Sequence, residues 1–205
     1  MPRITNFTPQ QKNRDRVNVF IDGKYTFSLD IFQISELQVK VGQELSDSEL
    51  EDLKKASDFG KLYARTLNWL VSRPHSERET RDYLFKKSTP PELSEAIINR
   101  LKSKNYLNDA NFARFWAENR FQKKGISRKR LELELLKKGI SREAIKEALK
   151  GSPRSDTAEI DKIIAKKHKK YANEPKKLLE YLIRQGFDYE LARSRVSETD
   201  SRNFE

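Results

Sequence analysis

The amino-acid sequence predicts a mainly α-helical protein: tandem three-helix repeats in an elongated, curved array, preceded by a small α+β module with a β-hairpin. Two stretches repeat the same spacing of apolar residues and glycine, and the hydrophobic period changes from two residues to about 3.6 after residue 56. Hydrophobic and charged residues each make up 36% of the 205 residues, as expected for units with thin cores. Such units bury their apolar stripes by stacking on one another.

The internal repeat is the strongest of these observations. One copy contains Leu135, Gly139, Ile140, Ile145 and Leu149, and the next contains Leu182, Gly186, Phe187, Ala192 and Val196, with the same gaps of four, one, five and four residues. A looser copy runs from Leu84 to Leu101 and is three residues longer around Pro90 and Pro91. Each copy predicts a helix, a short turn and a second helix, with the apolar positions in the core.

The first part of the chain predicts strands. Residues 16–21 and 24–29 are rich in strand-forming side chains and flank Asp22-Gly23. Asp-Gly between two such runs favours a type I′ hairpin turn, which needs positive φ at both central residues. Residues 3–7 are a candidate third strand.

Two helices follow the hairpin in this N-terminal module, which we bound at residues 1–56. Asp30 is suited to cap a short helix. Ser46 and Glu49 form a Ser-x-x-Glu capping box. We expect the helix that they open to end with the module, before a new helix begins near Phe59.

The repeats are bounded at residues 57–107, 108–151 and 152–199, and residues 200–205 are expected to form a frayed tail after a last helix that ends near Ser197. Ser76 with Glu79 forms a second capping box, and Asn108 and Ser127 are suited to begin further helices. Gly151–Pro153 is the clearest linker in the chain. It predicts a hinge between the second and third repeats.

Composition and targeting signals exclude several classes of protein. The chain has no Cys, which excludes disulfides and thiolate metal sites and fits a reducing compartment. No apolar run reaches the length of about 20 residues that spans a bilayer, and residues 1–5 lack the apolar core of a secretory signal. We therefore expect a soluble, cytoplasmic, monomeric protein without membrane contact.

Motifs for catalysis are missing from the sequence. It contains no nucleophile elbow, His-Glu-x-x-His, Walker A loop or dinucleotide-binding glycine fingerprint. The histidines His75 and His168 lie far apart and have no obvious partners. We expect a protein that is not an enzyme and that binds no cofactor or metal.

Positive charge is concentrated in the repeats. The chain carries a net charge of +11. Residues 1–56 contain 8 Lys and Arg against 9 Asp and Glu, a net charge of −1, whereas residues 57–205 contain 34 against 22, a net charge of +12. A basic domain of this kind favours a polyanion or an acidic protein surface as its partner.

Two clusters of basic residues are the candidate partner-binding sites. The first surrounds Gly125, where two predicted helices meet, and comprises Arg120, Lys123, Lys124, Arg128, Lys129 and Arg130, with Lys137 and Lys138 at the far end of the second helix. The second is a stripe of Lys162, Lys166, Lys169 and Lys170, with only Asp161 nearby to balance it. Either cluster can contact an acidic protein or phosphates. The alternatives are ordinary enrichment of cations at helix C-termini for the first cluster and a solvated helix face for the second.

Aromatic residues argue against specific binding of single-stranded nucleic acid. Trp69, Phe115 and Trp116 lie at helical spacing among Leu and Ala, which favours core positions over base-stacking platforms. Any direct contact with nucleic acid is therefore expected to involve its backbone and to weaken with salt.

Four short motifs, in this order and spacing, are similar to those of a known family. They are Arg-Pro-His-Ser-Glu-Arg-Glu at 73–79, Tyr-Leu-Asn-Asp-Ala-Asn-Phe-Ala at 106–113, Arg-Leu-Glu-Leu-Glu-Leu-Leu-Lys-Lys-Gly-Ile at 130–140 and Leu-Ile-Arg-Gln-Gly-Phe at 182–187. They resemble the RecX family of bacterial regulators of the RecA recombinase. Thr80, Ser88 and Asn108 depart from the family's usual residues.

The resemblance implies three tandem three-helix repeats that bind in the groove of RecA–DNA filaments and inhibit strand exchange and filament-dependent ATP hydrolysis. It implies no catalytic site, and it supplies no residue-level binding map. The expected partners are therefore the RecA filament and single- or double-stranded DNA, in DNA repair by homologous recombination. Two other hypotheses stay open: a helical protein that binds DNA directly and competes with RecA for single strands, and a scaffold for another partner.

Overall fold

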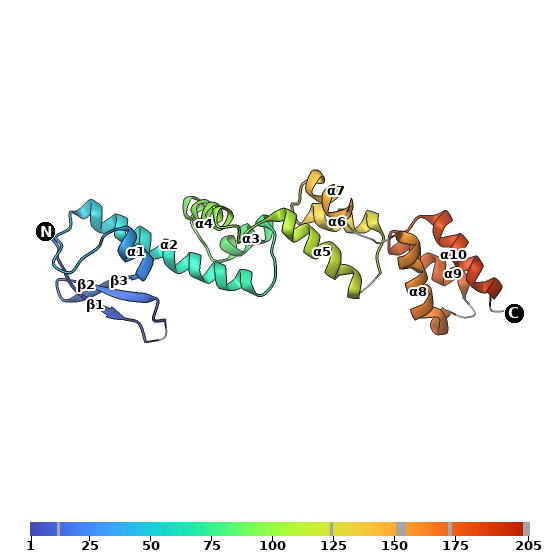
Figure 1. The fold of residues 1–205 in the computed structure, drawn as a ribbon, viewed down its shortest axis with the longest axis horizontal. Helices are drawn as coiled ribbons and strands as arrows, with labels where there is room; N and C mark the ends of the chain where they lie inside the picture. The colour runs from blue at the N-terminus through green and yellow to red at the C-terminus, as the bar shows by residue number, and fades with distance from the viewer. Residues whose placement is uncertain (12, 124, 151–154, 172–173, 203–205) are drawn as a thin grey trace. The chain divides into compact units, whose positions relative to one another are not determined.

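The structure is a computed structural model that describes residues 1–11, 13–123, 125–150, 155–171 and 174–202, without the side chains of residues 120–123, 168 and 199–202. Contacts divide the chain into two compact units (Figure 1). Unit 1 comprises residues 1–73 and 84–106, and unit 2 comprises residues 74–83 and 107–205. The predicted Gly151–Pro153 linker lies outside the described residues.

Unit 1 begins with an antiparallel sheet. Its strands, in spatial order, are β1 (Ile4–Pro9), β2 (Arg16–Ile21) and β3 (Lys24–Asp30). Asp22 and Gly23 have φ of 49° and 77°, so the hairpin turn has the two positive φ angles that a type I′ turn requires. One face of the sheet buries Ile4, Val19 and Leu29 against Leu53. The hairpin and the third strand are confirmed.

A short helix, α1 (Ile31–Glu36), follows the sheet. The carboxylate of Asp30 accepts a hydrogen bond from Gln33 N at 2.7 Å, and the Gln33 side chain accepts one from Asp30 N at 3.0 Å. The predicted N-cap is therefore confirmed, and it closes a reciprocal capping box. The Gln33 amide also donates to Ala56 O at 2.6 Å, which fixes α1 on the next helix.

The next helix, α2 (Asp47–Val71), is longer than the sequence predicts. The Ser46–Glu49 capping box that opens it is confirmed, but the predicted end near residue 56 and the new start near Phe59 are wrong. Ser57 Oγ donates to Ser28 O at 2.7 Å while its backbone continues the helix. Gly60 lies inside the helix, at a position where a Cβ would come within 2.5 Å of Gln33 Oε1 on α1. One helix thus joins the sheet module to the first repeat.

Two further helices complete the first repeat. They are α3 (Glu77–Lys86) and α4 (Pro91–Ser103). Helix α4 packs on α2 within unit 1 and buries Ile97, Ile98 and Leu101. The first turns of α3 belong to unit 2, because their contacts are with the second repeat.

Unit 2 contains the second and third repeats. Their helices are α5 (Asp109–Lys123), α6 (Arg128–Lys137), α7 (Arg142–Lys150), α8 (Asp156–Tyr171), α9 (Pro175–Arg184) and α10 (Tyr189–Arg202). The apolar residues of the two matched sequence copies are buried in two separate clusters, one in each repeat. These core positions are confirmed, but α10 continues beyond Ser197, where the sequence predicts its end. None of the helices in the described ranges is long and apolar enough to cross a membrane.

Candidate interaction surface and the joints between repeats

The same turn recurs between the last two helices of each repeat. Its residues with positive φ are Ser88 (54°), Gly139 (84°) and Gly186 (90°). Its returning hydrogen bonds are Thr89 N to Leu84 O at 3.2 Å, Ile140 N to Leu135 O at 3.1 Å and Phe187 N to Leu182 O at 3.3 Å. The looser first copy in the sequence thus forms the same helix C-cap as the two matched copies.

The turn of the second repeat packs on the start of α3. Ser76 caps α3 through a bond from Glu79 N at 3.1 Å, and its Oγ donates to Lys138 O at 2.8 Å. A Cβ on Gly139 would lie 2.9 Å from the Cβ of Arg78. The glycine therefore satisfies two demands, a left-handed backbone and a close approach to the preceding repeat.

The turn of the third repeat packs on the start of α6 in the same way. Ser127 N donates to Gln185 O at 3.2 Å, and Arg130 Nη1 donates to Arg184 O at 2.8 Å. A Cβ on Gly186 would lie 2.6 Å from Ser127 Oγ. An N-cap serine from one repeat and a glycine turn from the next thus form both joints.

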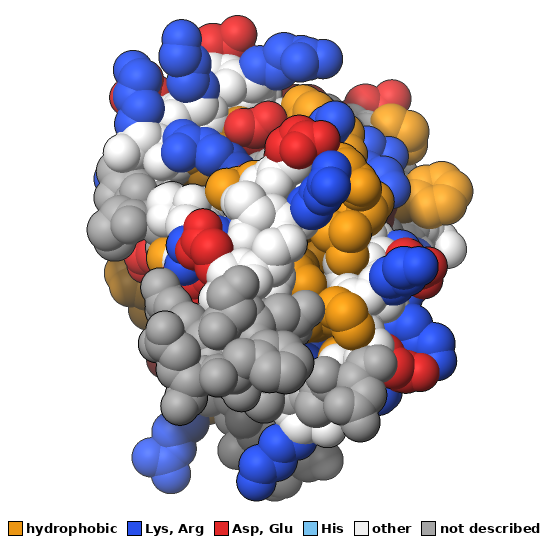
Figure 2. Space-filling view, turned by 90° about the vertical axis from the view of Figure 1, so that its right-hand side faces the viewer, with side chains coloured by type: hydrophobic (Ala, Val, Ile, Leu, Met, Phe, Trp, Pro, Cys, Tyr) orange, Lys and Arg blue, Asp and Glu red, His pale blue; other side chains and the backbone are white. Residues whose placement is uncertain are grey.

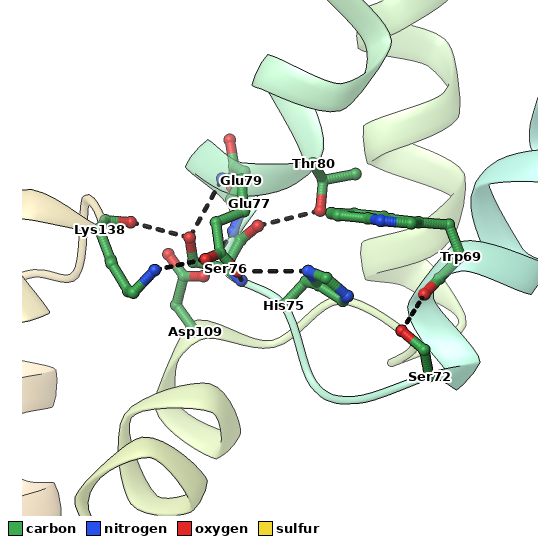
Figure 3. A network of polar contacts seen from close by, with 9 residues as sticks. All are labelled: Trp69, Ser72, His75, Ser76, Glu77, Glu79, Thr80, Asp109 and Lys138. Carbon is green, nitrogen blue, oxygen red and sulfur yellow. Dashed lines mark hydrogen bonds and ion pairs between the residues drawn. The ribbon is translucent and has the colours of Figure 1, made fainter. Parts of the chain in front are cut away.

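A polar network surrounds the first joint (Figure 3). The expectation that His75 lacks a partner is wrong, because its buried Nδ1 lies 3.3 Å from Glu79 Oε2. The other oxygen of Glu79 accepts from Lys138 Nζ at 2.5 Å. On the other side of the network, Glu77 N donates to Asp109 Oδ1 at 2.8 Å. These contacts link α3, the start of α5 and the end of α6.

Several residues of the first basic cluster have structural roles. The Lys138 ammonium lies 4.4 Å from the centre of the Trp116 ring in addition to its ion pair with Glu79. The Arg130 guanidinium bonds the end of α9, and its Nε lies 3.8 Å from Glu134. These contacts within the protein make both side chains poor candidates for an external partner.

The rest of the first cluster divides into two groups. Arg128, Lys129 and Lys137 are exposed on α6. The side chains of Arg120 and Lys123 and the whole of Lys124 lie outside the described residues, so their place in the cluster stays a prediction.

The lysine stripe lies on the exposed side of α8. Ile160, Ile163 and Ile164 are buried on the opposite side. The exposed residues are Lys162, Lys166, Lys169 and Lys170, as the spacing predicts. Lys167 is half-buried, with its Nζ 4.5 Å from the centre of the Tyr181 ring.

The charge balance of the stripe differs from the prediction at Lys162. Its Nζ lies 3.1 Å from Oε1 of Glu159, a buried residue three positions earlier. Asp161 forms a bidentate pair with Arg195, at 2.7 and 2.8 Å. These hydrogen bonds, with the charge of Asp161, raise the pKa of Arg195 against the opposing effect of desolvation. Asp161 is thus matched by a cation on α10, and Lys166 and Lys169 form no ion pair within the described ranges.

The two basic groups come from adjoining elements of unit 2. Arg128 N donates to Asp156 Oδ1 at the start of α8, at 2.8 Å. A Cβ on Gly125 would lie 2.7 Å from Ile163 Cδ1, so the turn before α6 rests on α8. Figure 2 shows a face on which Lys and Arg side chains lie around a strip of hydrophobic side chains.

Three family models match the chain. They are the regulatory protein RecX N-terminal domain over residues 2–46, the first three-helix domain of RecX over residues 63–101 and its second three-helix domain over residues 108–149. The matched domains are a sheet module and two three-helix domains, all named for a regulatory protein. This arrangement defines the chain as a helical-repeat regulatory protein. The chain belongs to the RecX family of regulatory proteins.

Relatives named regulatory protein RecX match nearly the full chain. Those of Bacillus licheniformis and Bacillus subtilis are each 32% identical, over 99% and 100% of this chain and 80% of their own length. A relative from Listeria monocytogenes is 32% identical over 97% of this chain and 76% of its own length.

Two crystal structures share the fold. A regulatory protein RecX has a TM-score of 0.77 and 23% identity, covering 94% of this chain and 98% of that one. RecX from Lactobacillus salivarius has a TM-score of 0.60 and 24% identity, covering 71% of this chain and 98% of that one. At 23% and 24% identity, these similarities show a shared fold and nothing further.

Proposed function

We propose that this protein is a non-enzymatic regulator of the RecA recombinase, which binds RecA–DNA filaments and inhibits strand exchange and filament-dependent ATP hydrolysis. The observation that carries this proposal is membership of the RecX family of regulators across nearly the whole chain. This role implies action in the cytoplasm, as a monomer, during DNA repair by homologous recombination.

The repeats supply a physical basis for binding a filament. A filament presents the same surface at regular intervals, and linked binding modules gain affinity because one contact raises the local concentration of the next. The serine–glycine joints hold one helix of each repeat against the turn of its neighbour. Successive repeats can therefore offer related surfaces to successive protomers.

The basic residues with no structural role are the proposed contacts. Arg128 and Lys129 on α6, with Lys166 and Lys169 on α8, are exposed and form no side-chain ion pair within the described parts of the chain. Exposed, unpaired cations attract acidic protein surface and DNA phosphates. Arg120, Lys123, Lys124, Lys137, Lys162 and Lys170 remain in the proposed surface, whereas Arg130 and Lys138 hold the joints.

Co-sedimentation with filaments of RecA on single-stranded DNA tests the proposal. The protein is expected in the pellet with filaments, and it should lower their rate of ATP hydrolysis. Failure to pellet with filaments and an unchanged ATPase rate would contradict the proposal.

A second candidate is a direct DNA-binding protein that competes with RecA for single strands. The unpaired Lys166 and Lys169 favour it, because phosphate binding needs cations that are not neutralised within the protein. It predicts binding to single-stranded DNA without RecA, with an affinity that falls steeply with salt. The DNA-only arm of the co-sedimentation experiment separates the two functions.

A further inference from the structure

Unit 1 contains a groove between α1, α2 and α4. It has a volume of about 1260 Å³, above the range of about 300–1,000 Å³ that is usual for small-molecule pockets. Gln33, fixed against Gly60 and Ala56, forms part of its floor. The groove thus lies where the sheet module meets the first repeat, on elements whose spacing is fixed.

Aromatic side chains line the groove and reach solvent. Phe59 and Tyr63 stack on α2, with ring centres 5.7 Å apart and an angle of 12° between their planes. Phe32 on α1 is 82% exposed, and Tyr106 after α4 is 57% exposed. Burial raises the pKa of Tyr63, with a further contribution from Tyr106. Large apolar groups that stay exposed together mark interaction sites.

The rims of the groove carry opposite charges. Arg100 and Lys104 lie one turn apart at the end of α4, and Glu36 lies on the α1 side. Within the described ranges, none of these three side chains forms an ion pair. Arg100 and Tyr63 line the same groove, and the Arg100 charge partly offsets the rise in the Tyr63 pKa that burial causes.

We propose that this groove binds an amphipathic helical segment of a partner protein, whose apolar stripe lies on Phe32, Tyr63 and Tyr106. Its acidic flank faces Arg100 and Lys104, and a basic residue on its other flank faces Glu36. A helix laid in an apolar groove is a recurring mode of peptide recognition. The charge arrangement favours a polypeptide over a nucleic acid, because the acidic residues Asp30 and Glu36 also line the groove and repel phosphates. This site is separate from the basic residues of α6 and α8 and does not rest on RecA binding.

Fluorescence anisotropy with the full-length protein tests the proposal. The probe is a labelled synthetic helix of about 14 residues, about 21 Å long. It carries Leu and Phe at positions i, i+4, i+7 and i+11, with Glu on one flank and Lys on the other. Phe32→Ser is expected to weaken binding at least about tenfold, because a central aromatic anchor carries much of the affinity. Phe85→Ser is the matched control, since Phe85 is also 82% exposed but lies outside the groove.

A charge exchange sharpens the test. The double variant Arg100→Glu, Lys104→Glu should bind the probe about tenfold more weakly, and a probe with Lys on both flanks should restore binding, because both rims of the variant carry Glu. Circular dichroism confirms that each variant is folded. Equal binding of a probe with Ser in place of its apolar residues would overturn the proposal. So would Phe32-dependent binding of labelled single-stranded DNA, or Phe32-dependent self-association in sedimentation.

Discussion

Ser76 Oγ donates a hydrogen bond of 2.8 Å to Lys138 O across a separation of 62 residues. The same hydroxyl also caps α3. The Ser76 side chain therefore satisfies a backbone group at the end of each of two helices. It accepts from one of the first N–H groups of α3 and donates to one of the last carbonyl groups of α6.

Replacing this serine should cost more than replacing an ordinary N-cap. Ser76→Ala is expected to lower the free energy of unfolding by about 2 kcal/mol, because it removes a cap and leaves a carbonyl in the joint without its donor. Ser46→Ala is the matched control, since Ser46 caps α2 without a joint and should cost about 1 kcal/mol. Urea titration followed by circular dichroism measures both. Equal losses would show that the bond to Lys138 contributes nothing.

The joint glycines are expected to tolerate no side chain. Gly139→Ala and Gly186→Ala should each destabilise the protein by about 2–4 kcal/mol, since a left-handed alanine costs about 1–2 kcal/mol and its Cβ also overlaps the preceding repeat. Ser88→Ala should change stability by less than about 0.5 kcal/mol, because Ser88 already carries a Cβ at positive φ. Thermal and urea unfolding report these differences. A Gly139→Ala variant with an unchanged free energy of unfolding would rule out the close approach of Gly139 to Arg78.

Charge reversal on α8 should weaken binding without unfolding the protein. Lys166→Glu with Lys169→Glu is expected to reduce retention on RecA–DNA filaments, and to lower the salt slope by about 1 per lysine if phosphates are the partner. Lys24→Glu with Lys40→Glu, on the exposed surface of the sheet module, is the control and should leave retention unchanged. Filament binding that both pairs leave intact would remove α8 from the contact surface.

The cluster around Gly125 is tested in the same assay. Charge reversal at Lys123, Lys124, Arg128 and Lys129 is expected to weaken inhibition of the RecA ATPase with an unchanged circular dichroism spectrum. Reversal of Arg130 should instead lower the melting temperature, because its guanidinium bonds Arg184 O in the second joint. Full inhibition by the folded fourfold variant would exclude this cluster as a contact.

The Ser46–Glu49 capping box should make stability depend on acid. Hydrogen bonds from the Ser46 backbone and side chain lower the pKa of Glu49 from its ordinary value of 4.5. A lowered folded-state pKa gives stability that is present above pH 4.5 and is lost as the pH falls through the folded value. Glu49→Gln should therefore be less stable than the parent at pH 7, and the gap should narrow as the pH falls below 4.5 and Glu49 becomes protonated. A gap that is the same at both pH values would contradict this assignment.

The local parts of the fold could be predicted from the sequence. The Asp22-Gly23 turn, the capping serines and the repeated apolar residues each depend on neighbours within a few positions. The reason for a glycine inside α2 could not be predicted, because it depends on Gln33 approaching Gly60 from another helix.

The candidate site was predictable only in part, for the same reason. The alternation of lysine and isoleucine on α8 follows from helical periodicity. The pairing of Lys162 with Glu159 joins residues three positions apart on α8, a spacing that is visible in the sequence. The contacts that assign Lys138 and Arg130 to the joints come from residues more than fifty positions away, Glu79 and Arg184.

The turn at Ser88, the first of the three repeat turns, differs from the turns at Gly139 and Gly186. Ser88 occupies the place of Gly139 and Gly186, so the first turn carries a Cβ where those glycines have none. At the other end, Glu174 precedes α9 without a side-chain cap bond, where Ser76 and Ser127 cap the equivalent helices. The described repeats thus offer a second copy neither half of a joint, so we expect the stacking of repeats not to continue from one molecule to the next.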